Sequence, residues 1–373
     1  MIHYRTILVL VYAPVFGQQY TISTIAGDGT AGAFLNYPTS VAVDQEGDVY
    51  VADWSGFIRK IWVKDGATTI VAGTGVLGFG GDGGQATNAM FGKGISIALD
   101  AVGNLYFADA DNNRIRRIDA STRIITTVAG TGAAVDSGDG GPGVDAGVSR
   151  PTGVAVDAGG NLYFSSWSRV RKLSANSRII ETVAGQSTTS FGGDGGPAVD
   201  ALFWDPVPSA INRRGDIYIA DYENSRIRLV TASTGTVTTL VGSGACVTAP
   251  AAFNVAVCQG GFGGDGGPAT NATLNHAATM VLDAEGNLYI ADTINHRIRK
   301  VDVSTGLIRT IAGTGLNGFG GDGGPANAAE ISFSVGIALD KAGRVYFADE
   351  NNNRIRVLIP TQQPSRLKRE PRH

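Results

Sequence analysis

The sequence predicts an all-β protein, a six-bladed β-propeller built from four-stranded blades. Three observations predict this fold. The segment GNLYIADTINHRIRKVDVSTGLIRTIAG at 286–313 recurs along the chain in six copies, the last of them truncated. Each copy is a series of short strand-like runs separated by turns. A strand near the N-terminus matches the strand that the sixth copy lacks. Radial repetition of four-stranded units is the signature of a propeller.

A tyrosine marks the same position in every copy: Tyr50, Tyr106, Tyr163, Tyr218, Tyr289 and Tyr346. Successive markers lie 56, 57, 55, 71 and 57 residues apart, and the long interval contains a cysteine-bearing insertion. Within a unit, an apolar inner strand such as GVAVD leads through DAGGN into LYFS. A polar turn, an arginine-rich third strand and a fourth strand such as IRTIAG follow. Each blade is therefore expected to gain its stability chiefly from packing on its neighbours.

The two ends of the repeat array predict a closed ring. The sixth copy stops near Pro360, before its fourth strand, whereas YTISTIAG at 20–27 resembles the missing IITTVAG. The first strand would complete the last blade and remove two open sheet edges. We therefore expect one propeller over residues 18–360 rather than two domains.

The N-terminus has the pattern of an export signal over residues 1–17. His3 and Arg5 precede the apolar run TILVLVYAPVFG, and small residues allow cleavage between Gly17 and Gln18. The run is too short for a membrane-spanning helix; the alternative is a buried first strand. We expect a secreted or periplasmic protein. The basic stretch at 361–373 is expected to be a disordered, solvated tail, with a binding role as the alternative.

Composition narrows the functional classes. The formal net charge of −3 gives no electrostatic footprint for nucleic acid. The two cysteines, Cys246 and Cys258, lie in one insertion, and in an exported protein we expect them to form a local disulfide. Without histidine nearby in the sequence they are a weak zinc signal.

Glycine is abundant, at 53 of 373 residues against a usual share of about 7%. The segment GFGGDGG at 78–84 satisfies the dinucleotide pattern G-x-G-x-x-G, and the match recurs at Gly261 and Gly318. No βαβ unit surrounds these segments, and their aspartate would repel phosphate. They are expected to be interblade connectors, in which glycine permits tight turns. In four of the connectors a proline follows the glycines and suits the first position of a short helical turn: Pro142, Pro197, Pro268 and Pro325.

The units PTGVAVDAGGNLYFSS (151–166) and LYIADTINHRIRKVD (288–302) resemble NHL repeats. The GFGGDGGPATNA connectors are most similar to those of secreted bacterial NHL proteins and of the teneurin NHL region. The resemblance covers about residues 20–360. It implies a six-bladed propeller that serves as a binding platform for proteins, sugars or nucleic acid. Some similar propellers are enzymes, among them amidating lyase, streptogramin lyase and gluconolactonases, so function has to be argued from the site.

Two residue types recur in nearly every unit and are expected to maintain the blades. An aspartate ends the second strand in five units, with Ser166 in the third, and an arginine lies in every third strand. Aspartate can cap the following turn and arginine can bind it. The run DADNN at 109–113 resembles the start of a calcium loop, but Arg114 and Ala120 occupy positions that need glycine and an acid. An Asx-type turn is the interpretation there.

The candidate site consists of the positions at which the copies differ. Connectors and the turns between second and third strands should emerge on one face of the ring, and the irregular residues lie on that face. One position, just before each inner strand, differs in all six units: Tyr37, Lys93, Arg150, Asp205, His276 and Phe333. Aromatic residues add to this face, where such side chains often mark recognition surfaces: Trp54, Trp167, Trp204 and Tyr222. The alternative is that connector ends simply tolerate change.

The scarcity of histidine argues against most enzymatic possibilities. Apart from His3 and His373, only His276 and His296 remain, so a three-histidine zinc site cannot be built. We expect an exported, monomeric, non-catalytic binding or scaffold propeller without a cofactor. Its partner is expected to be an extracytoplasmic protein, peptide or glycan, not a nucleic acid. A metal-assisted lyase or lactonase is the alternative, and it would rest on an Asp205–His276 acid/base pair.

Overall fold

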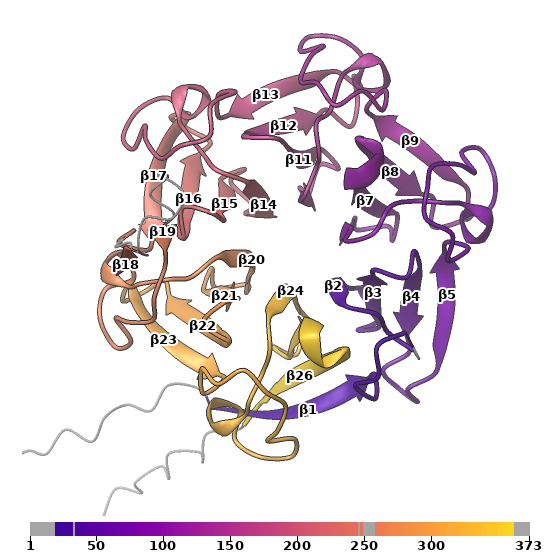
Figure 1. Ribbon diagram of the computed structural model, residues 1–373. Coiled ribbons are helices and arrows are strands. Elements are labelled where there is room, and N and C mark those ends of the chain that lie inside the picture. Colours follow the sequence, from indigo (N-terminus) through magenta and orange to yellow (C-terminus); the bar gives the residue numbers. More distant parts are fainter. Residues whose placement is uncertain (1–18, 33, 245–246, 249–257, 362–373) are drawn as a thin grey trace, which may run out of the picture.

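The computed structural model describes residues 19–32, 34–244, 247–248 and 258–361. It is a ring of six four-stranded antiparallel sheets whose innermost strands surround a central axis (Figure 1). The predicted all-β, six-bladed propeller is therefore confirmed. The predicted signal segment at 1–17 and all but the first residue of the predicted tail at 361–373 lie outside the described residues.

Each blade begins with its innermost strand. Blade 1 consists of β2 (Pro38–Val43), β3 (Val49–Asp53), β4 (Ile58–Ile61) and β5 (Thr68–Ala72). Blade 2 consists of β6 (Ser96–Leu99), β7 (Leu105–Asp109), β8 (Arg114–Ile118) and β9 (Ile125–Ala129). Blade 3 consists of β10 (Val154–Val156), β11 (Leu162–Ser166), β12 (Arg169–Leu173) and β13 (Ile180–Ala184).

The second half of the ring repeats this order. Blade 4 consists of β14 (Pro206–Ile211), β15 (Ile217–Asp221), β16 (Arg226–Thr231) and β17 (Thr236–Val241). Blade 5 consists of β20 (Ala277–Leu282), β21 (Leu288–Asp292), β22 (Arg297–Asp302) and β23 (Leu307–Ala312). Blade 6 consists of β24 (Ser334–Leu339), β25 (Val345–Asp349), β26 (Arg354–Pro360) and β1 (Tyr20–Ala26).

Strand β1 closes the ring as predicted. It pairs antiparallel with β26, from Tyr20 opposite Pro360 to Ala26 opposite Ile355, with one irregularity in the register. Indigo β1 therefore lies beside yellow β26 in Figure 1, although they come from opposite ends of the described chain. The first strand is the outermost strand of the last blade, so hydrogen bonds between the two ends of the described chain hold the ring closed.

The hydrophobic core is divided into layers between neighbouring blades. Six clusters of buried side chains each combine residues of two adjacent blades. In the layer between blades 1 and 2, Ala52 and Ile58 pack with Phe91 of the connector and with Ile97 and Phe107 of blade 2. A blade removed from the ring would expose both of its faces, which is why the blades stabilise one another.

The glycine-rich segments are interblade connectors, as predicted. Their phenylalanine lies against two arginines of the blade that follows: the guanidinium carbons of Arg297 and Arg299 lie 3.6 and 4.9 Å from the Phe262 ring centroid. Their aspartate accepts hydrogen bonds from the same blade, Asp265 from Arg299 at 2.7 Å. Phenylalanine and aspartate together thus hold the connectors of blades 2, 4, 5 and 6 against the third strand, and in blade 3 only the aspartate does so.

Each of these connectors continues into a 3₁₀ turn, and two further turns follow β7 and β25: η1 (Ala86–Asn88), η2 (Ala110–Asn112), η3 (Gly143–Asp145), η4 (Ala198–Asp200), η5 (Ala269–Asn271), η6 (Ala326–Ala328) and η7 (Glu350–Asn352). The expected place of the prolines is off by one residue. Pro142, Pro197, Pro268 and Pro325 occupy the N-cap with extended ψ of 128–136°, not the first helical position. The residue before the turn must be extended, and this suits proline equally well.

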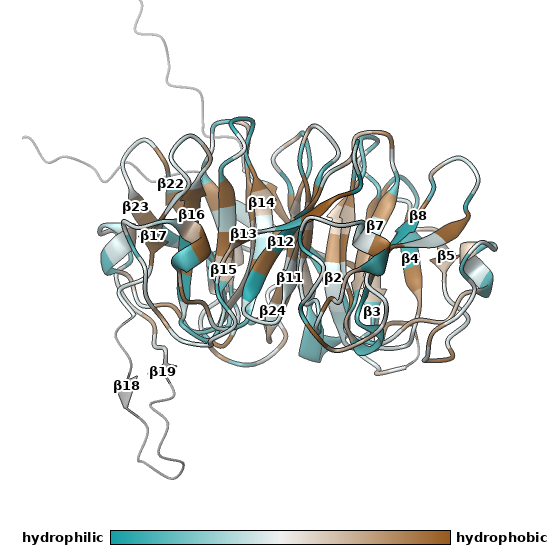
Figure 2. Ribbon diagram, turned by 90° about the horizontal axis from the view of Figure 1, so that it is seen from above, coloured by the Kyte–Doolittle hydropathy of each residue, from teal (hydrophilic) through white to brown (hydrophobic). Residues whose placement is uncertain are grey.

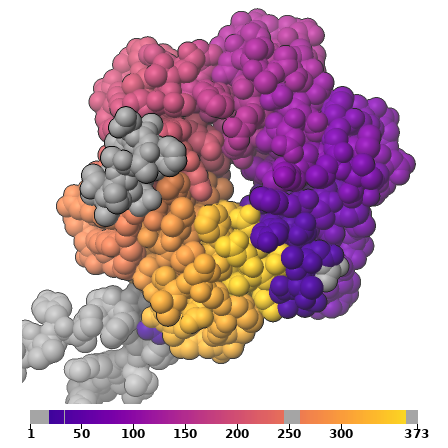
Figure 3. Space-filling view, in the orientation of Figure 1, coloured from indigo at the N-terminus to yellow at the C-terminus, as the bar shows by residue number. Residues whose placement is uncertain are grey.

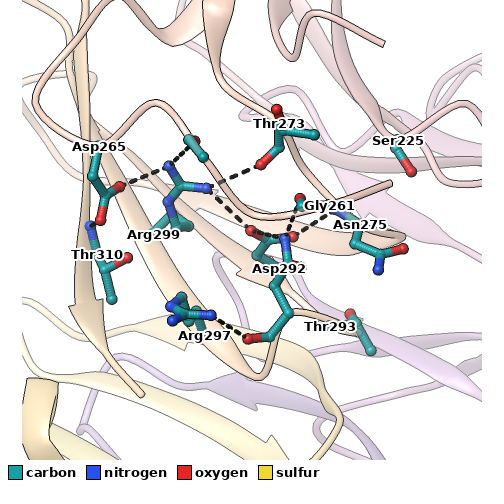
Figure 4. A network of polar contacts seen from close by, with 12 residues as sticks. Ser225, Gly261, Asp265, Thr273, Asn275, Asp292, Thr293, Arg297, Arg299 and Thr310 are labelled. Carbon is teal, nitrogen blue, oxygen red and sulfur yellow. Dashed lines mark hydrogen bonds and ion pairs between the residues drawn. The ribbon is translucent and has the colours of Figure 1, made fainter. Parts of the chain in front are cut away.

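The recurring aspartate and arginine form an ion pair in every blade except blade 3, where Ser166 replaces the aspartate; Figure 4 shows the network of blade 5. Arg299 is fully buried and bridges two carboxylates, Asp265 at 2.7 Å and Asp292 at 3.2 Å. Asp292 also accepts the backbone N–H of Asn275 at 2.8 Å. Burial raises the pKa of Asp292 to about 6, against the lowering effect of its hydrogen bonds and of Arg299. The structural role predicted for these residues is confirmed.

The two faces of the ring differ, as Figure 2 shows in side view. The short pair β18 (Val247–Thr248) and β19 (Cys258–Gln259) projects from one of them. It belongs to the connector between blades 4 and 5, so we call this side the connector face. Among the described residues, no helix has the length and apolar character needed to cross a bilayer.

Candidate functional site

Strand pairing brings the two variable positions of each blade together on the connector face. The first residue of the inner strand pairs with the last residue of the second strand, Pro206 with Asp221 and Ser334 with Asp349. The residue before the inner strand therefore lies beside the residue after the second strand. The N–H of Tyr222 donates to the carbonyl of Asp205 at 3.4 Å, and in blade 1 the Tyr37 and Trp54 rings lie 5.3 Å apart.

The predicted ring position is a left-handed backbone turn. Five of its six members have φ between 39° and 59°: Tyr37, Arg150, Asp205, His276 and Phe333. In blade 2 Gly94 has this conformation instead of Lys93. Several of these residues donate their N–H to a side chain of the preceding blade, as Arg150 does to Asn113 at 3.0 Å and His276 does to Ser225 at 3.1 Å. The backbone is thus held by the ring, which leaves the side chain free to vary.

A first cavity of about 230 Å³ lies between blades 3 and 4. Its lining combines four predicted residues with three that were not predicted: Arg150, Trp167, Trp204 and Asp205, with Thr152, Thr189 and Glu223. The carboxylate of Asp205 accepts a hydrogen bond from the Thr152 hydroxyl at 3.2 Å. The Arg150 guanidinium lies 5.9 Å from the Trp167 ring centroid. We call this cavity the blade 3–4 pocket.

The electrostatics of the blade 3–4 pocket centre on Asp205. Burial raises the pKa of Asp205, the Thr152 hydrogen bond lowers it, and the nearby Glu223 charge raises it again. Arg150 is the cation that opposes these effects. The pocket therefore presents carboxylates and one guanidinium beside two indole surfaces, which suits a ligand that has both apolar and hydrogen-bonding faces.

A second cavity of about 420 Å³ lies at the channel mouth, where the space-filling view shows an opening at the centre of the ring (Figure 3). Four predicted residues line it, Trp54, Asp205, Tyr222 and Phe333. Glu350 also lines this channel-mouth cavity. Asp205 and Thr152 line both cavities, so the two adjoin.

Glu350 is the main residue that the sequence interpretation missed. It is 8% exposed, and in the described part of the chain its carboxylate has no hydrogen-bond or ion-pair partner, so burial alone acts on it. Burial raises its pKa to about 7. A signal for it existed, because Glu350 follows the second strand of blade 6 at the position that Trp54, Trp167 and Tyr222 occupy in other blades. Of the residues at that position, only the aromatic ones were predicted to belong to the site.

Three predicted residues support the cavities from outside rather than line them. The Nζ of Lys93 lies 5.2 Å from the Trp54 ring centroid, and Tyr37 packs on the same ring. His276 packs edge-on against Tyr222 at 4.9 Å. Its Nε2 lies 3.4 Å from Glu223 Oε2, so His276 pairs with this carboxylate and not with Asp205.

Two further expectations concern metals and cysteines. Over the residues that the structure describes, no three His, Cys, Asp or Glu side chains gather in a way that could hold a metal ion. Cys246 lies outside the described residues, and of Cys258 only the backbone pairing in β19 is described. The Cys246–Cys258 disulfide stays a prediction.

The opposite face has its own opening of about 450 Å³, lined by the turns between first and second strands. Its carboxylates are engaged within their own turns: one oxygen of Asp100 accepts the N–H groups of Val102 and Asn104, at 3.0 and 2.9 Å. Asp340 does the same for Ala342 and Arg344. This repetition fits a structural role for these groups, and the irregular residues remain on the connector face.

Six four-stranded blades in a closed ring define the class of six-bladed β-propellers. The NHL repeat family matches residues 35–56. The chain is similar to NHL repeat-containing protein 2 of Gallus gallus, with 28% identity over 87% of this chain and 46% of that protein. It is also similar to human teneurin-1, with 26% identity over 92% of this chain and 13% of that protein. The chain is thus a six-bladed β-propeller with a match to the NHL repeat, similar to NHL-repeat proteins, and it spans less than half the length of these curated relatives.

Solved structures share the fold. A Bacteroides thetaiotaomicron protein of unknown function has a TM-score of 0.65 at 18% identity, over 92% of this chain and 76% of that chain. An auxiliary nutrient binding protein of the same organism has a TM-score of 0.62 at 15% identity, over 92% and 77%. Similarity at this level of identity establishes the architecture only, so the function has to come from the connector face.

Proposed function

We propose that the chain is an exported, non-catalytic binding propeller that recognises its ligand on the connector face. The observation that carries this proposal is the blade 3–4 pocket, in which Trp167 and Trp204 meet Arg150, Asp205 and Glu223 from two blades. Its volume of about 230 Å³ is below the range of roughly 300–1,000 Å³ for drug-sized ligands. A pocket of this size suits one unit of a larger ligand.

Among an extracytoplasmic protein, peptide or glycan, the lining favours a glycan. A sugar ring has an apolar C–H face that can stack on indole, and hydroxyl groups around its edge. Carboxylates accept hydrogen bonds from such hydroxyls, and a guanidinium donates to their oxygens. Five of the seven lining residues are charged or hydroxylic, more than an apolar peptide side chain would need. The auxiliary nutrient binding protein that shares the fold offers a precedent for a binding role.

Export is part of the same proposal. It rests on the apolar run TILVLVYAPVFG and the small residues before Gln18. A disulfide between Cys246 and Cys258 would fit an oxidising compartment, either periplasmic or extracellular. N-terminal sequencing of the protein exported by its host would place the cleavage site. Recovery of the intact N-terminus would contradict export through this signal.

The test of the binding site is a glycan array followed by calorimetry on the full chain and its variants. Trp167→Ala combined with Trp204→Ala should lower affinity for any glycan hit at least tenfold without changing the unfolding midpoint. Trp62→Ala is a matched control, because Trp62 is also exposed, at 41%, but does not line the pocket. Unchanged affinity in the double variant, or binding of peptides alone, would contradict the proposal.

A metal-assisted lyase or lactonase remains the second candidate, favoured by one observation. His276 and Glu223 form a pair at 3.4 Å beside the two cavities, which is a geometry suited to proton transfer. Thermal unfolding with and without EDTA tests this candidate, because a metal bound to the folded state raises the unfolding midpoint. A clear fall with chelator would favour the enzyme, and an unchanged midpoint would favour the binding propeller.

A further inference from the structure

The channel-mouth cavity contains a carboxylate without a countercharge. Glu350 lies at the start of η7, is 8% exposed and lines this cavity. Its backbone N–H donates to the carbonyl of Phe333 at 3.3 Å, but its carboxylate has no hydrogen bond or ion pair to any described residue. By contrast, the neighbouring acids that end the second strands, such as Asp292, are bound by arginine and backbone N–H groups. Burial of an unpaired carboxylate is costly, so such a group is expected to have a partner that is not part of the chain.

The walls of the cavity narrow the choice of partner. Trp54, Tyr222 and Phe333 supply aromatic rings, and Asp205 supplies a second carboxylate. Aromatic faces attract cations, and organic ammonium groups in particular are held between such faces. One ammonium–aromatic contact is present beside the channel-mouth cavity: the Lys93 Nζ, outside the cavity, lies 5.2 Å from the centroid of the Trp54 ring.

We propose that the channel-mouth cavity is a subsite for an organic ammonium group, held by Glu350 and Asp205 and surrounded by Trp54, Tyr222 and Phe333. The subsite goes beyond the glycan-binding proposal. It rests on different side chains, apart from Asp205, which lines both cavities. A ligand that occupied both would have an amine beside its glycan unit.

A metal ion is the weaker choice of cation. Calcium takes six to eight oxygen ligands, and magnesium requires octahedral coordination. The cavity offers two carboxylates, and the other oxygen-bearing side chains in its lining are hydroxyls, which are weak metal ligands: Thr39, Ser40, Ser96, Thr152, Tyr222 and Thr279. An organic ammonium needs the negative charge and the aromatic faces that are present, and its N–H groups can also donate to the hydroxyls of the lining.

The experiment titrates the full chain with n-butylammonium and tetramethylammonium at constant ionic strength, followed by NMR of the tryptophan indoles. Wild type should bind at least one of the two probes saturably, and n-butanol, the neutral analogue, should not compete. Glu350→Gln preserves shape and should weaken binding at least fivefold. Trp167→Ala should leave ammonium binding intact, so loss of the glycan site and loss of this subsite are distinguishable.

Three results would overturn the subsite. The first is no saturable binding of either ammonium probe by the wild type. The second is equal affinity in wild type and Glu350→Gln. The third is binding of calcium in place of both probes, with loss of that binding in Glu350→Gln.

Discussion

The Thr152 hydroxyl of blade 3 donates a hydrogen bond to the Asp205 carboxylate of blade 4 across 3.2 Å. Both residues line the two adjoining cavities, so this contact joins neighbouring blades at the centre of the candidate site. Because the bond lowers the pKa of Asp205 while burial raises it, Thr152 helps to keep the carboxylate charged. An interblade contact is thus one of the interactions that favour the charged form of Asp205.

The first prediction concerns this bond. Thr152→Val should raise the pKa of Asp205 further and lower the free energy of unfolding by about 1 kcal/mol, the usual value of one hydrogen bond. Carbon-detected NMR titration of the Asp205 carboxyl measures the pKa. Thr189→Val is the control, because Thr189 lines the blade 3–4 pocket but is not bonded to Asp205. An unchanged Asp205 pKa in Thr152→Val would show that the bond has no electrostatic role.

A second prediction compares two blades. Arg299→Met leaves buried Asp292 without its cation, and breaking such a pair costs about 3–5 kcal/mol. Arg171 occupies the same position in blade 3, but there Ser166 replaces the aspartate. Arg171→Met should therefore cost less, since no fully buried carboxylate is left behind. Urea unfolding of both variants is the measurement, and equal losses would refute the role assigned to the second carboxylate.

The third prediction concerns pH. The pKa of Glu350 is about 7 in the folded chain, above its ordinary value of 4.5, so the folded state binds more protons than the unfolded state between these values. Stability attributable to Glu350 is therefore present at low pH and lost as pH rises through this window. The facing titratable groups are Asp205 and Tyr222, and the pKa of Tyr222, at about 12, lies well above the window.

Glu350→Gln should abolish this loss and be more stable than wild type by about 2 kcal/mol at pH 8, with little difference at pH 4.5. Denaturant unfolding across pH 4.5–8 gives the comparison. Glu285→Gln, at an exposed turn position, is the control for a general charge effect. Parallel stability curves for wild type and Glu350→Gln would mean that Glu350 is solvated or paired in the folded chain.

Much of the architecture could be predicted because it is repeated. Six copies average out the ambiguity of any single strand, and the complementary ends at 20–27 and Pro360 imply ring closure. The connector interpretation of GFGGDGG also followed from repetition. The stacking of Phe262 on Arg297 and Arg299 did not, because it joins residues about 35 positions apart whose packing no local pattern encodes.

The site was predictable only in part. Variation among copies directed attention to the residues before the inner strands, and the structure brings two of them, Arg150 and Asp205, into one cavity. Variation alone did not distinguish Arg150 and Asp205 from Lys93 and His276. The last two do not line the cavities, because Lys93 packs on Trp54 and His276 packs on Tyr222. Side-chain direction depends on the left-handed turn and on neighbouring blades, neither of which appears in a one-dimensional alignment.

The sequence by itself therefore determined the number of blades, their strand order, the closure of the ring and the face on which the copies differ, because these follow from period and hydrophobic pattern. Only the tertiary structure decided which variable residues share a cavity and which carboxylates remain without a partner. The buried, unpaired state of Glu350 is the clearest case. The desolvation of a carboxylate depends on all the side chains packed around it, and those around Glu350 come from several blades.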